Sequence, residues 1–215
     1  MKPPWTIPDP IPDAQFREIR LSMIFDHHKW DSQFEDVASI GRRCLILDAQ
    51  AWDQLRRQSE RLWAEALAAE KEILTRPDLC KLLGLGRRLR RACTRTSRRV
   101  PSVEMARIMR FDFHFTEEGW RISEANADVP GGFIESSAFA DLACGCYPGA
   151  SPSPDVGELY ARTVASSLGR AARVAFVHAT AYTDDRQVMV FLADRFAAEG
   201  LEPVLASPAD LVWDR

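Results

Sequence analysis

The sequence lacks any apolar run that approaches the roughly 18–20 residues needed to span a bilayer. Its proline-rich start, MKPPWTIPDPIP, contains no apolar segment of the kind found at the centre of a signal peptide. Strong net charge is absent too, since the formal charge is only −3. These absences predict a cytoplasmic protein with no membrane partner, and they argue against nucleic acid as a partner.

Cysteine pairs with a metal-binding or redox spacing are also missing. The five cysteines are an odd number, and none are spaced as CxxC: Cys44, Cys80, Cys93, Cys144 and Cys146. The Cys144-Gly-Cys146 spacing is wrong for a zinc knuckle or a thioredoxin-type motif. We therefore predict buried or incidental free thiols.

What the chain does contain is an alternation of helical and strand patterns, typical of a mixed α/β protein. Residues 1–30 form a proline-rich lead-in, and residues 31–150 contain a helix-rich region followed by a hairpin. The turn-rich segment 148–157, PGASPSPDVG, predicts a domain boundary. Residues 151–215 then predict an incomplete β-α-β domain with a parallel strand pair.

Parallel sheets are normally covered on both faces. We therefore expect the chain to be the N-terminal part of a longer protein, with self-association as the other way to cover the sheet. Acidic residues mark three predicted helix starts: Asp48 before a long helix, Asp78 before a short helix that ends near Gly84, and Asp184 or Asp185 before the last helix.

One segment is strongly basic. From Lys81 to Arg99 there are eight Lys or Arg residues and no acidic residue. A phosphate-binding patch is one interpretation. A solvated helix face with a basic loop is the other, and the absence of interleaved aromatic residues for base stacking favours it.

The stretch RFDFHFTEEGWRISEAN predicts a hairpin over residues 107–126. Side chains two residues apart on a strand share a face, so Arg110 and Asp112 point one way and the intervening phenylalanines point the other. A three-residue turn, 117–119, with a left-handed Gly119 would set Asp112 opposite Glu124. This register also sets Arg110 opposite Asn126, whereas a four-residue turn would separate them.

On that register the second strand presents Trp120, Ile122, Glu124 and Asn126 on one face. Two directly opposed carboxylates repel each other and need neutralisation by an arginine or by a cation. Asp112, Glu124 and Asn126 carry the oxygen ligands that Mg²⁺ takes together with phosphate oxygens and water. Arg110 suits a bidentate phosphate contact. A surface ion-pair cluster is the alternative interpretation.

The pattern R-x-D followed by E-x-N-x-D, a proline and small residues resembles the metal-binding segment of circularly permuted ATP-grasp enzymes, the glutathionylspermidine synthase-like family. The matching positions are Arg110, Asp112, Glu124, Asn126, the loop 127–132 and the helix start Phe133-Ile134-Glu135. Weaker similarity around Trp30-Asp31, in the long helix and in the terminal β-α-β unit extends the resemblance over most of residues 30–215. It implies the antiparallel hairpin of a permuted ATP-grasp domain, followed by the start of a Rossmann-like pre-ATP-grasp domain.

The resemblance further implies the N-terminal portion of an ATP-dependent carboxylate–amine ligase, which forms a C–N bond through an acyl phosphate. Its cofactor would be Mg²⁺, with ATP, a small carboxylate and an amine as substrates. The implied metal ligands are Asp112, Glu124 and Asn126, with Arg110 as the catalytic cation beside the transferring phosphoryl group. The implied substrate-binding residues are Asp128, Gly131, Gly132 and Glu135.

Two features depart from the family pattern. The loop Val129-Pro130-Gly131-Gly132 offers backbone N–H groups where glutathionylspermidine synthases have hydroxyl residues around the proline. The nucleotide-binding lysines and glycine-rich loop are missing, and the permutation would put them downstream of Arg215; the short Gly84-Leu85-Gly86 is better explained as a helix C-cap. The alternatives are a non-catalytic ligand- or partner-binding protein of the same fold and a protein that binds nucleic acid through residues 81–99.

Overall fold

The computed structural model describes residues 2–30, 33–34, 37–96, 107–168, 172–179 and 181–212. Contacts within the chain define two compact units, each made of two separate stretches of sequence. Unit 1 comprises Met1–Pro4 and Leu47–Ala127, and unit 2 comprises Trp5–Ile46 and Asp128–Arg215. The sequence analysis had instead predicted consecutive domains with boundaries near residues 31 and 151, and these boundaries stay a prediction.

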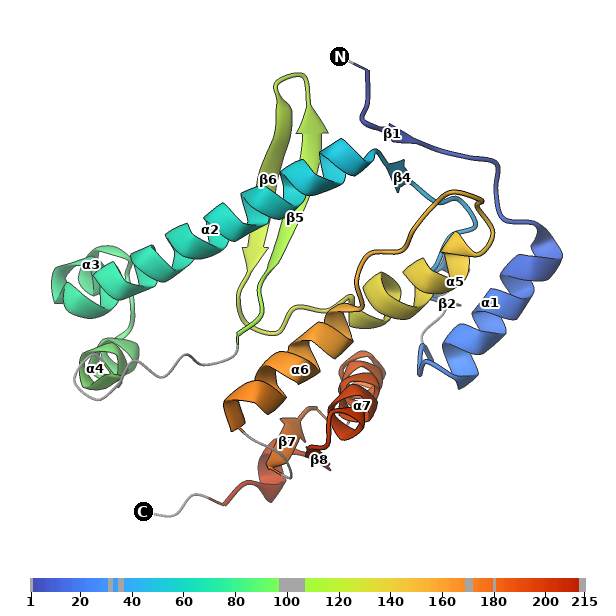
Figure 1. Cartoon of the computed structure of the whole chain (residues 1–215). Helices are drawn as coiled ribbons and strands as arrows, with labels where there is room; N and C mark the ends of the chain where they lie inside the picture. Colours follow the sequence, from blue (N-terminus) through green and yellow to red (C-terminus); the bar gives the residue numbers. More distant parts are fainter. Residues whose placement is uncertain are drawn as a thin grey trace. The chain divides into compact units, whose positions relative to one another are not determined.

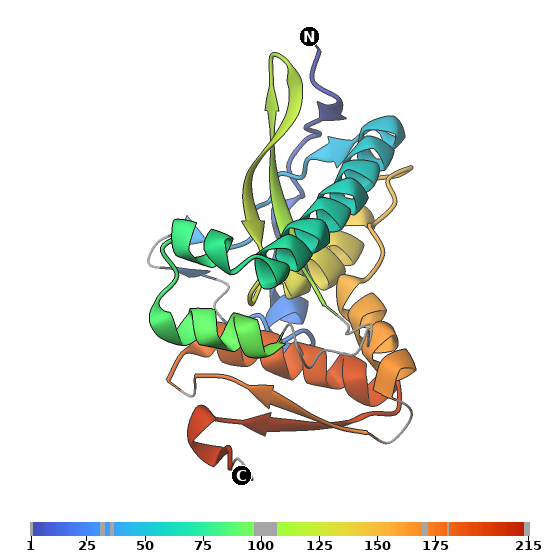
Figure 2. The same ribbon diagram turned by 90° about the vertical axis from the view of Figure 1, so that its left-hand side faces the viewer.

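In its described residues, unit 1 consists of helices and one antiparallel hairpin (Figure 1). The helices are α2 (Ala49–Thr75), α3 (Pro77–Leu82) and α4 (Arg87–Thr96), and the hairpin strands are β5 (Arg110–Thr116) and β6 (Gly119–Asn126). α3 and α4 pack against each other and against α2 (Figure 2). The helix predicted after Asp48 is thus confirmed, and the hairpin predicted over residues 107–126 is present as β5 and β6, with its first strand beginning at Arg110.

The caps of these helices differ from the prediction. Asp48 is the N-cap residue of α2, but its side chain makes no capping hydrogen bond. Asp78 lies in the first turn of α3, after the N-cap Arg76, and the Arg76 Nη2 lies 2.7 Å from Asp78 Oδ2. Gly84 ends this segment with a left-handed φ of 70°, as its expected C-cap role requires.

Unit 2 contains the β-α-β element and the helices packed on it. Its helices are α1 (Asp13–Phe25), the π-helical turn η1 (Glu135–Phe139), α5 (Ala140–Cys144), α6 (Val156–Leu168), α7 (Thr183–Ala198) and the 3-10 turn η2 (Pro208–Asp210). Its principal strands are β7 (Arg173–Val177) and β8 (Glu202–Ala206), with short strands β1 (Trp5–Thr6), β2 (Gln33–Phe34), β3 (Val37–Ala38) and β4 (Ile46–Leu47), the last ending at the boundary with unit 1.

β7 and β8 pair in parallel and are joined by α7, which confirms the predicted β-α-β unit. Phe196 of α7 is fully buried between aromatic side chains of two other elements. Its ring centroid lies 4.9 Å from that of Phe176 on β7 and 5.6 Å from that of Tyr160 on α6, both in edge-to-face geometry. The core of unit 2 therefore lies between α6, α7 and one face of the parallel pair (Figure 2).

Residues 1–30, predicted as a proline-rich lead-in, contain a helix that the prediction missed. α1 starts directly after Pro12. A proline is well tolerated just before a helix, whereas inside a longer helix its missing backbone N–H would remove a hydrogen bond. Three side chains at helical spacing, Phe16, Ile19 and Met23, are buried. The start of α7 was also assigned incorrectly, since its N-cap residue is Tyr182, and Asp184 and Asp185 occupy its first turn.

Two further observations concern the cysteines and the length of the helices. All five cysteines are free thiols. In the described part of the chain no helix is both long and apolar enough to cross a membrane. The basic segment from Lys81 is helical over α4 as far as Thr96, and its residues 97–99 lie outside the described residues. Asp31, part of the Trp30-Asp31 similarity, also lies outside them.

Candidate functional site

The hairpin brings the four predicted polar residues together on one ladder. Arg110 pairs with Asn126, and Asp112 pairs with Glu124, as the sequence predicted. The turn that achieves this register differs from the predicted one: Thr116 pairs with Gly119, so the loop between the paired residues contains Glu117 and Glu118 only. Gly119 does have the expected left-handed φ, at 96°.

A two-residue loop alone would not place Asp112 opposite Glu124. A regular ladder running from the Thr116–Gly119 pair would set Ser123 opposite Asp112. The register instead shifts between Asp112 and Phe113, where Ser123 is the extra residue of a β-bulge on β6. The bulge, not the turn, therefore restores the pairing of the two carboxylates.

The same bulge changes which residues share a face. Trp120 pairs with Phe115, and Ile122 pairs with Phe113, so both belong to the phenylalanine face, whereas the sequence had predicted the polar face for them. The Phe115 and Trp120 rings meet edge to face, with centroids 5.1 Å apart. The expectation that Trp120 and Ile122 share a face with Glu124 was therefore wrong, because one inserted residue reverses the alternation of a strand.

Arg110 neutralises both carboxylates of the cluster. Its Nε lies 2.7 Å from Asp112 Oδ1 and its Nη2 lies 3.1 Å from Asp112 Oδ2, a bidentate contact. The same Nη2 lies 3.8 Å from Glu124 Oε1. The hydrogen bonds from Arg110 lower the pKa of Asp112, so this carboxylate stays ionised opposite Glu124 near neutral pH.

His114 contributes to the edge of this cluster through the bulge. One of its ring nitrogens lies 2.6 Å from the hydroxyl oxygen of Ser123, and Ser123 in turn lies 3.5 Å from the backbone carbonyl oxygen of Asp112. His114 thus contacts the bulged residue and also helps to lower the pKa of Asp112.

The predicted substrate-binding residues belong to unit 2. Gly131, Gly132 and Glu135 line a pocket of about 200 Å³, whereas Asp128 is exposed and is not among its lining residues. Three of the four residues thus line one pocket, and their role in substrate binding stays a prediction. No nucleotide-binding residues had been predicted within the chain.

A buried ion pair forms one wall of this pocket. Lys29 is 95% buried, and its Nζ lies 2.7 Å from Glu135 Oε1. The left-handed His28, with φ of 61°, directly precedes Lys29 and turns the chain back at the end of α1, where the Lys29 N–H donates to the Met23 carbonyl. The charge of Lys29 is therefore held inside the unit by backbone geometry as well as by its partner.

The sequence analysis missed several residues of this pocket. Lys29, Asp184, Asp185 and Gln187 line it together with the glycine loop. The two aspartates had been predicted only as helix caps, and Gln187, which is 2% exposed, had not been singled out. A buried lysine cannot be recognised from local sequence, because its partner Glu135 lies more than a hundred residues away along the chain.

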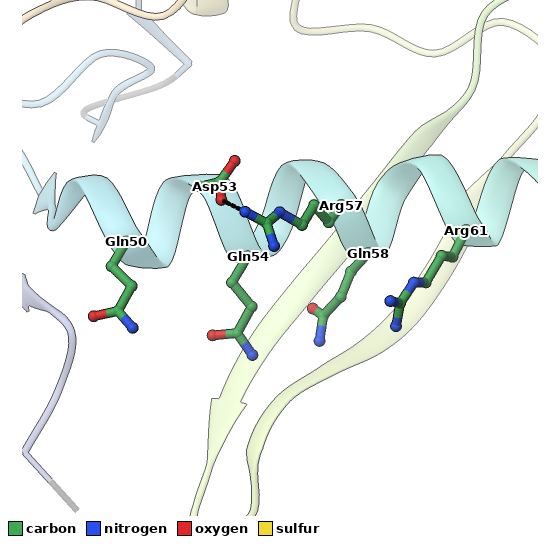
Figure 3. A pocket seen from close by; sticks show the side chains of 6 residues that line it. All are labelled: Gln50, Asp53, Gln54, Arg57, Gln58 and Arg61. Carbon is green, nitrogen blue, oxygen red and sulfur yellow. Dashed lines mark ion pairs between the residues drawn. The ribbon is translucent and has the colours of Figure 1, made fainter.

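A second hollow lies along α2 in unit 1 (Figure 3). It has a volume of about 380 Å³, and all six lining side chains come from α2: Gln50, Asp53, Gln54, Arg57, Gln58 and Arg61. Asp53 is already engaged by Arg57, 2.5 Å away, and by Arg56. This surface offers amides and guanidinium groups but no unengaged carboxylate, so its chemistry is unlike that of the hairpin.

Within the described residues, no group of three or more His, Cys, Asp or Glu side chains is arranged to hold a metal ion. The hairpin offers two carboxylates, and its third candidate ligand is the amide of Asn126. Comparison with protein-family models and with curated proteins gave no match for this chain. The geometry of the hairpin is therefore the principal support for a function.

Proposed function

We propose that the chain is the N-terminal portion of an ATP-dependent carboxylate–amine ligase and supplies the Mg²⁺–phosphate half of its active site. The single observation that carries this proposal is the bulge at Ser123, which sets Glu124 opposite Asp112 in a hairpin whose turn would otherwise separate them. Bulges are frequent beside active sites, where they redirect a side chain. A chain that needed only a stable hairpin would favour the regular ladder, which avoids opposed carboxylates.

In this proposal Asp112, Glu124 and Asn126 would hold a magnesium ion, which would supply positive charge to the phosphates of ATP. Arg110, now paired with Asp112 and close to Glu124, would stabilise the negative charge of the transferring phosphoryl group. The present pairing of Arg110 is then the arrangement without the cation, in which the arginine neutralises the carboxylates that the cation would otherwise neutralise. We also propose that the hairpin belongs to a permuted ATP-grasp domain and that the β-α-β unit after it begins a Rossmann-like domain.

The pocket of unit 2 supplies the candidate substrate-binding residues. Gly131 and Gly132 offer backbone N–H groups, and Glu135 and the aspartates of α7 offer negative charge to an amine. The buried Lys29 fixes the orientation of Glu135. Asp128 remains a proposed substrate contact without a place in the pocket.

The proposal is tested by calorimetric titration of the chain with ATP in the presence and absence of Mg²⁺. Wild type is compared with Glu124→Gln, which keeps the shape of the side chain and removes its charge, and with Glu117→Gln, which removes a carboxylate of the turn. We expect magnesium-dependent binding that Glu124→Gln weakens by about tenfold or more and that Glu117→Gln leaves unchanged. Binding that is indifferent to Glu124, or no binding, would reduce the hairpin to a surface ion-pair cluster.

One observation favours a second candidate, a non-catalytic protein of the same fold. Arg110 already satisfies Asp112 through two hydrogen bonds, which is also what a purely structural ion-pair cluster requires. Such a protein would bind a ligand or partner chain without turning it over. ATP binding in the titration without any phosphate release on addition of carboxylates and amines would favour this candidate.

A further inference from the structure

The turn between α3 and α4 in unit 1 exposes apolar side chains that neither site above explains. Three leucines of this short segment are more than half exposed: Leu82 at 83%, Leu83 at 58% and Leu89 at 59%. Single apolar side chains on a surface are ordinary, whereas a group of them marks a surface that another molecule covers.

Local hydrogen bonds hold the two helices at a tight and open turn. The Gly84 N–H donates to the Lys81 carbonyl oxygen at 3.0 Å, and Gly84 has a left-handed φ of 70°. No atom lies within 4 Å of a Cβ added to Gly84 or to Gly86, and α4 begins directly afterwards at Arg87. α3 and α4 lie together at one end of α2 (Figure 1). The exposed leucines therefore belong to one corner of unit 1, which we call the α3–α4 corner (residues 81–92).

Positive charge without acidic partners accompanies these leucines. From Lys81 to Thr96 the chain contains no acidic residue. Four exposed cations make no ion pair with any described residue: Lys81, Arg87, Arg88 and Arg91. By contrast, Arg76 just before α3 is held by two carboxylates. The charge of the α3–α4 corner is therefore available to an anionic partner.

The exposed side of α4 joins the two kinds of side chain. Successive residues of an α-helix are about 100° apart around its axis. The exposed residues of α4 therefore form one continuous arc, in this order: Arg87, Arg91, Arg88, Ala92 and Leu89. Such an arc suits a boundary between water and an apolar phase, because arginine stems lie along the apolar surface while the guanidinium groups stay in water.

We propose that the α3–α4 corner is an interaction surface for a membrane that contains anionic phospholipids. Leu82, Leu83 and Leu89 enter the boundary between headgroups and acyl chains, and the four cations contact the anionic headgroups. A contact of this kind needs no spanning helix, whereas the prediction of no membrane partner rested on the absence of long apolar runs. The inference is independent of the proposed ligase function.

The contact depends on both kinds of side chain. Each cation near an anionic leaflet strengthens binding by about fivefold, and salt screens this effect. Shallow insertion of a few apolar groups gives by itself only marginal, reversible binding. Affinity should therefore depend on lipid charge, on ionic strength and on the leucines together.

Two other anionic ligands use less of this surface. A single-stranded nucleic acid stacks its bases on aromatic side chains, and residues 81–96 contain none. A free phosphate or headgroup would contact the cations but would leave the leucines exposed to water. Only a lipid surface accounts for the exposed leucines and the exposed cations at the same time.

The test measures co-sedimentation of the chain with vesicles of phosphatidylcholine alone and of phosphatidylcholine mixed with phosphatidylserine. Binding to the mixed vesicles should be about tenfold tighter or more, and it should weaken as salt is added. Glycerophosphoserine, which is the same headgroup without acyl chains, should not displace the chain at an equal headgroup concentration. Labelled single-stranded DNA should bind more weakly than the mixed vesicles.

Two variants separate the apolar and the charged contributions. Leu82→Ser/Leu83→Ser and Arg87→Gln/Arg88→Gln should each weaken binding to the mixed vesicles by about tenfold or more. All four side chains are exposed, so folding should be unchanged, and the comparison of lipids with the wild type needs no variant.

Matched control variants carry the same changes in unit 2. Leu159→Ser/Leu168→Ser replaces two leucines that are 48% and 56% exposed, and Arg17→Gln/Arg43→Gln removes the same net charge. Both should bind the mixed vesicles as the wild type does. Equal binding to neutral and mixed vesicles, displacement by the headgroup, tighter binding of DNA, or undiminished binding of the leucine variant of the α3–α4 corner would overturn the proposal.

Discussion

At the scale of single residues, the chain controls its charge mainly through arginine. Arg110 is shared between two carboxylates on the hairpin, and Arg56 is shared between Asp53 and Glu60 on α2. Exposed pairs of this kind contribute little to stability individually. At the hairpin, the contact with Arg110 lowers the pKa of Asp112 and so keeps that carboxylate ionised.

Replacing Arg110 by glutamine should therefore raise the pKa of Asp112 towards its ordinary value of about 3.9. In the wild type this pKa is lowered in the folded state, so ionised Asp112 favours folding above about pH 4, and that contribution disappears as the pH falls through the lowered pKa. Arg110→Gln should remove this acid-range dependence. Carboxyl NMR titration measures it, with Asp53, whose own pKa is lowered by Arg56, as the unaffected control.

The Lys29–Glu135 pair permits a second prediction at this scale. Glu135→Gln removes one carboxylate from contact with a 95% buried ammonium group, which should cost roughly 2 kcal/mol of unfolding free energy, less than for a fully buried pair because Glu135 is 35% exposed. Lys29→Met/Glu135→Gln should recover part of the loss. Urea unfolding of the two single variants and the double variant measures the coupling, and additive effects would contradict it.

At the scale of elements, the hairpin is the segment where local geometry matters most. Its turn depends on Gly119 at φ of 96°, and the Thr116 hydroxyl donates to the Gly119 carbonyl oxygen at 2.8 Å. Its register depends on the bulge at Ser123. These two irregularities lie on the same strand, β6, and together they determine which side chains meet.

Gly119→Ala should destabilise unit 1 by about 1–2 kcal/mol, because alanine is strained at a left-handed φ even though no atom lies within 4 Å of the added Cβ. Gly41→Ala is the matched control, since Gly41 has neither a left-handed φ nor a close neighbour, and it should change stability by less than about 0.5 kcal/mol. Denaturant unfolding compares the two. Equal effects would show that the turn does not need its glycine.

At the scale of the whole molecule, the parallel pair β7–β8 leaves an apolar surface open to solvent. Phe176 faces α7, whereas the opposite face presents Val177 at 39% exposure and Val204 at 37%. Parallel strands are usually covered on both sides, so this face favours contact with further polypeptide. The predicted self-association of the chain belongs to this surface.

We expect the sedimentation coefficient of the chain to rise with concentration. Val204→Lys should weaken this association by about tenfold or more, because a charge would have to be desolvated in the contact. Val129→Lys is the matched control, since Val129 is 67% exposed on the loop before the glycines. A single monomer boundary at all concentrations would contradict the prediction.

The sequence by itself determined the elements whose signals are local. The apolar spacing after Asp48 predicts α2, the run RVAFV predicts β7, and the alternation of phenylalanine with charge predicts β5. Even the pairing of Asp112 with Glu124 could be predicted, although for the wrong reason, because the loop assumed was one residue too long and the bulge contributes the same single-residue shift. The pairing was predicted correctly because the number of residues between Asp112 and Glu124 that lie outside regular pairs is the same in both cases, although the turn type was wrong.

Only the tertiary structure decided the features that depend on residues far apart in the chain. The division into two units, each made of two stretches of sequence, and the burial of Lys29 against Glu135 have no local pattern. The bulge at Ser123 is likewise invisible in sequence, because a strand with one extra residue has the same composition as a regular one. In each case the deciding energy is that of packing between segments, and composition and periodicity do not encode which segments meet.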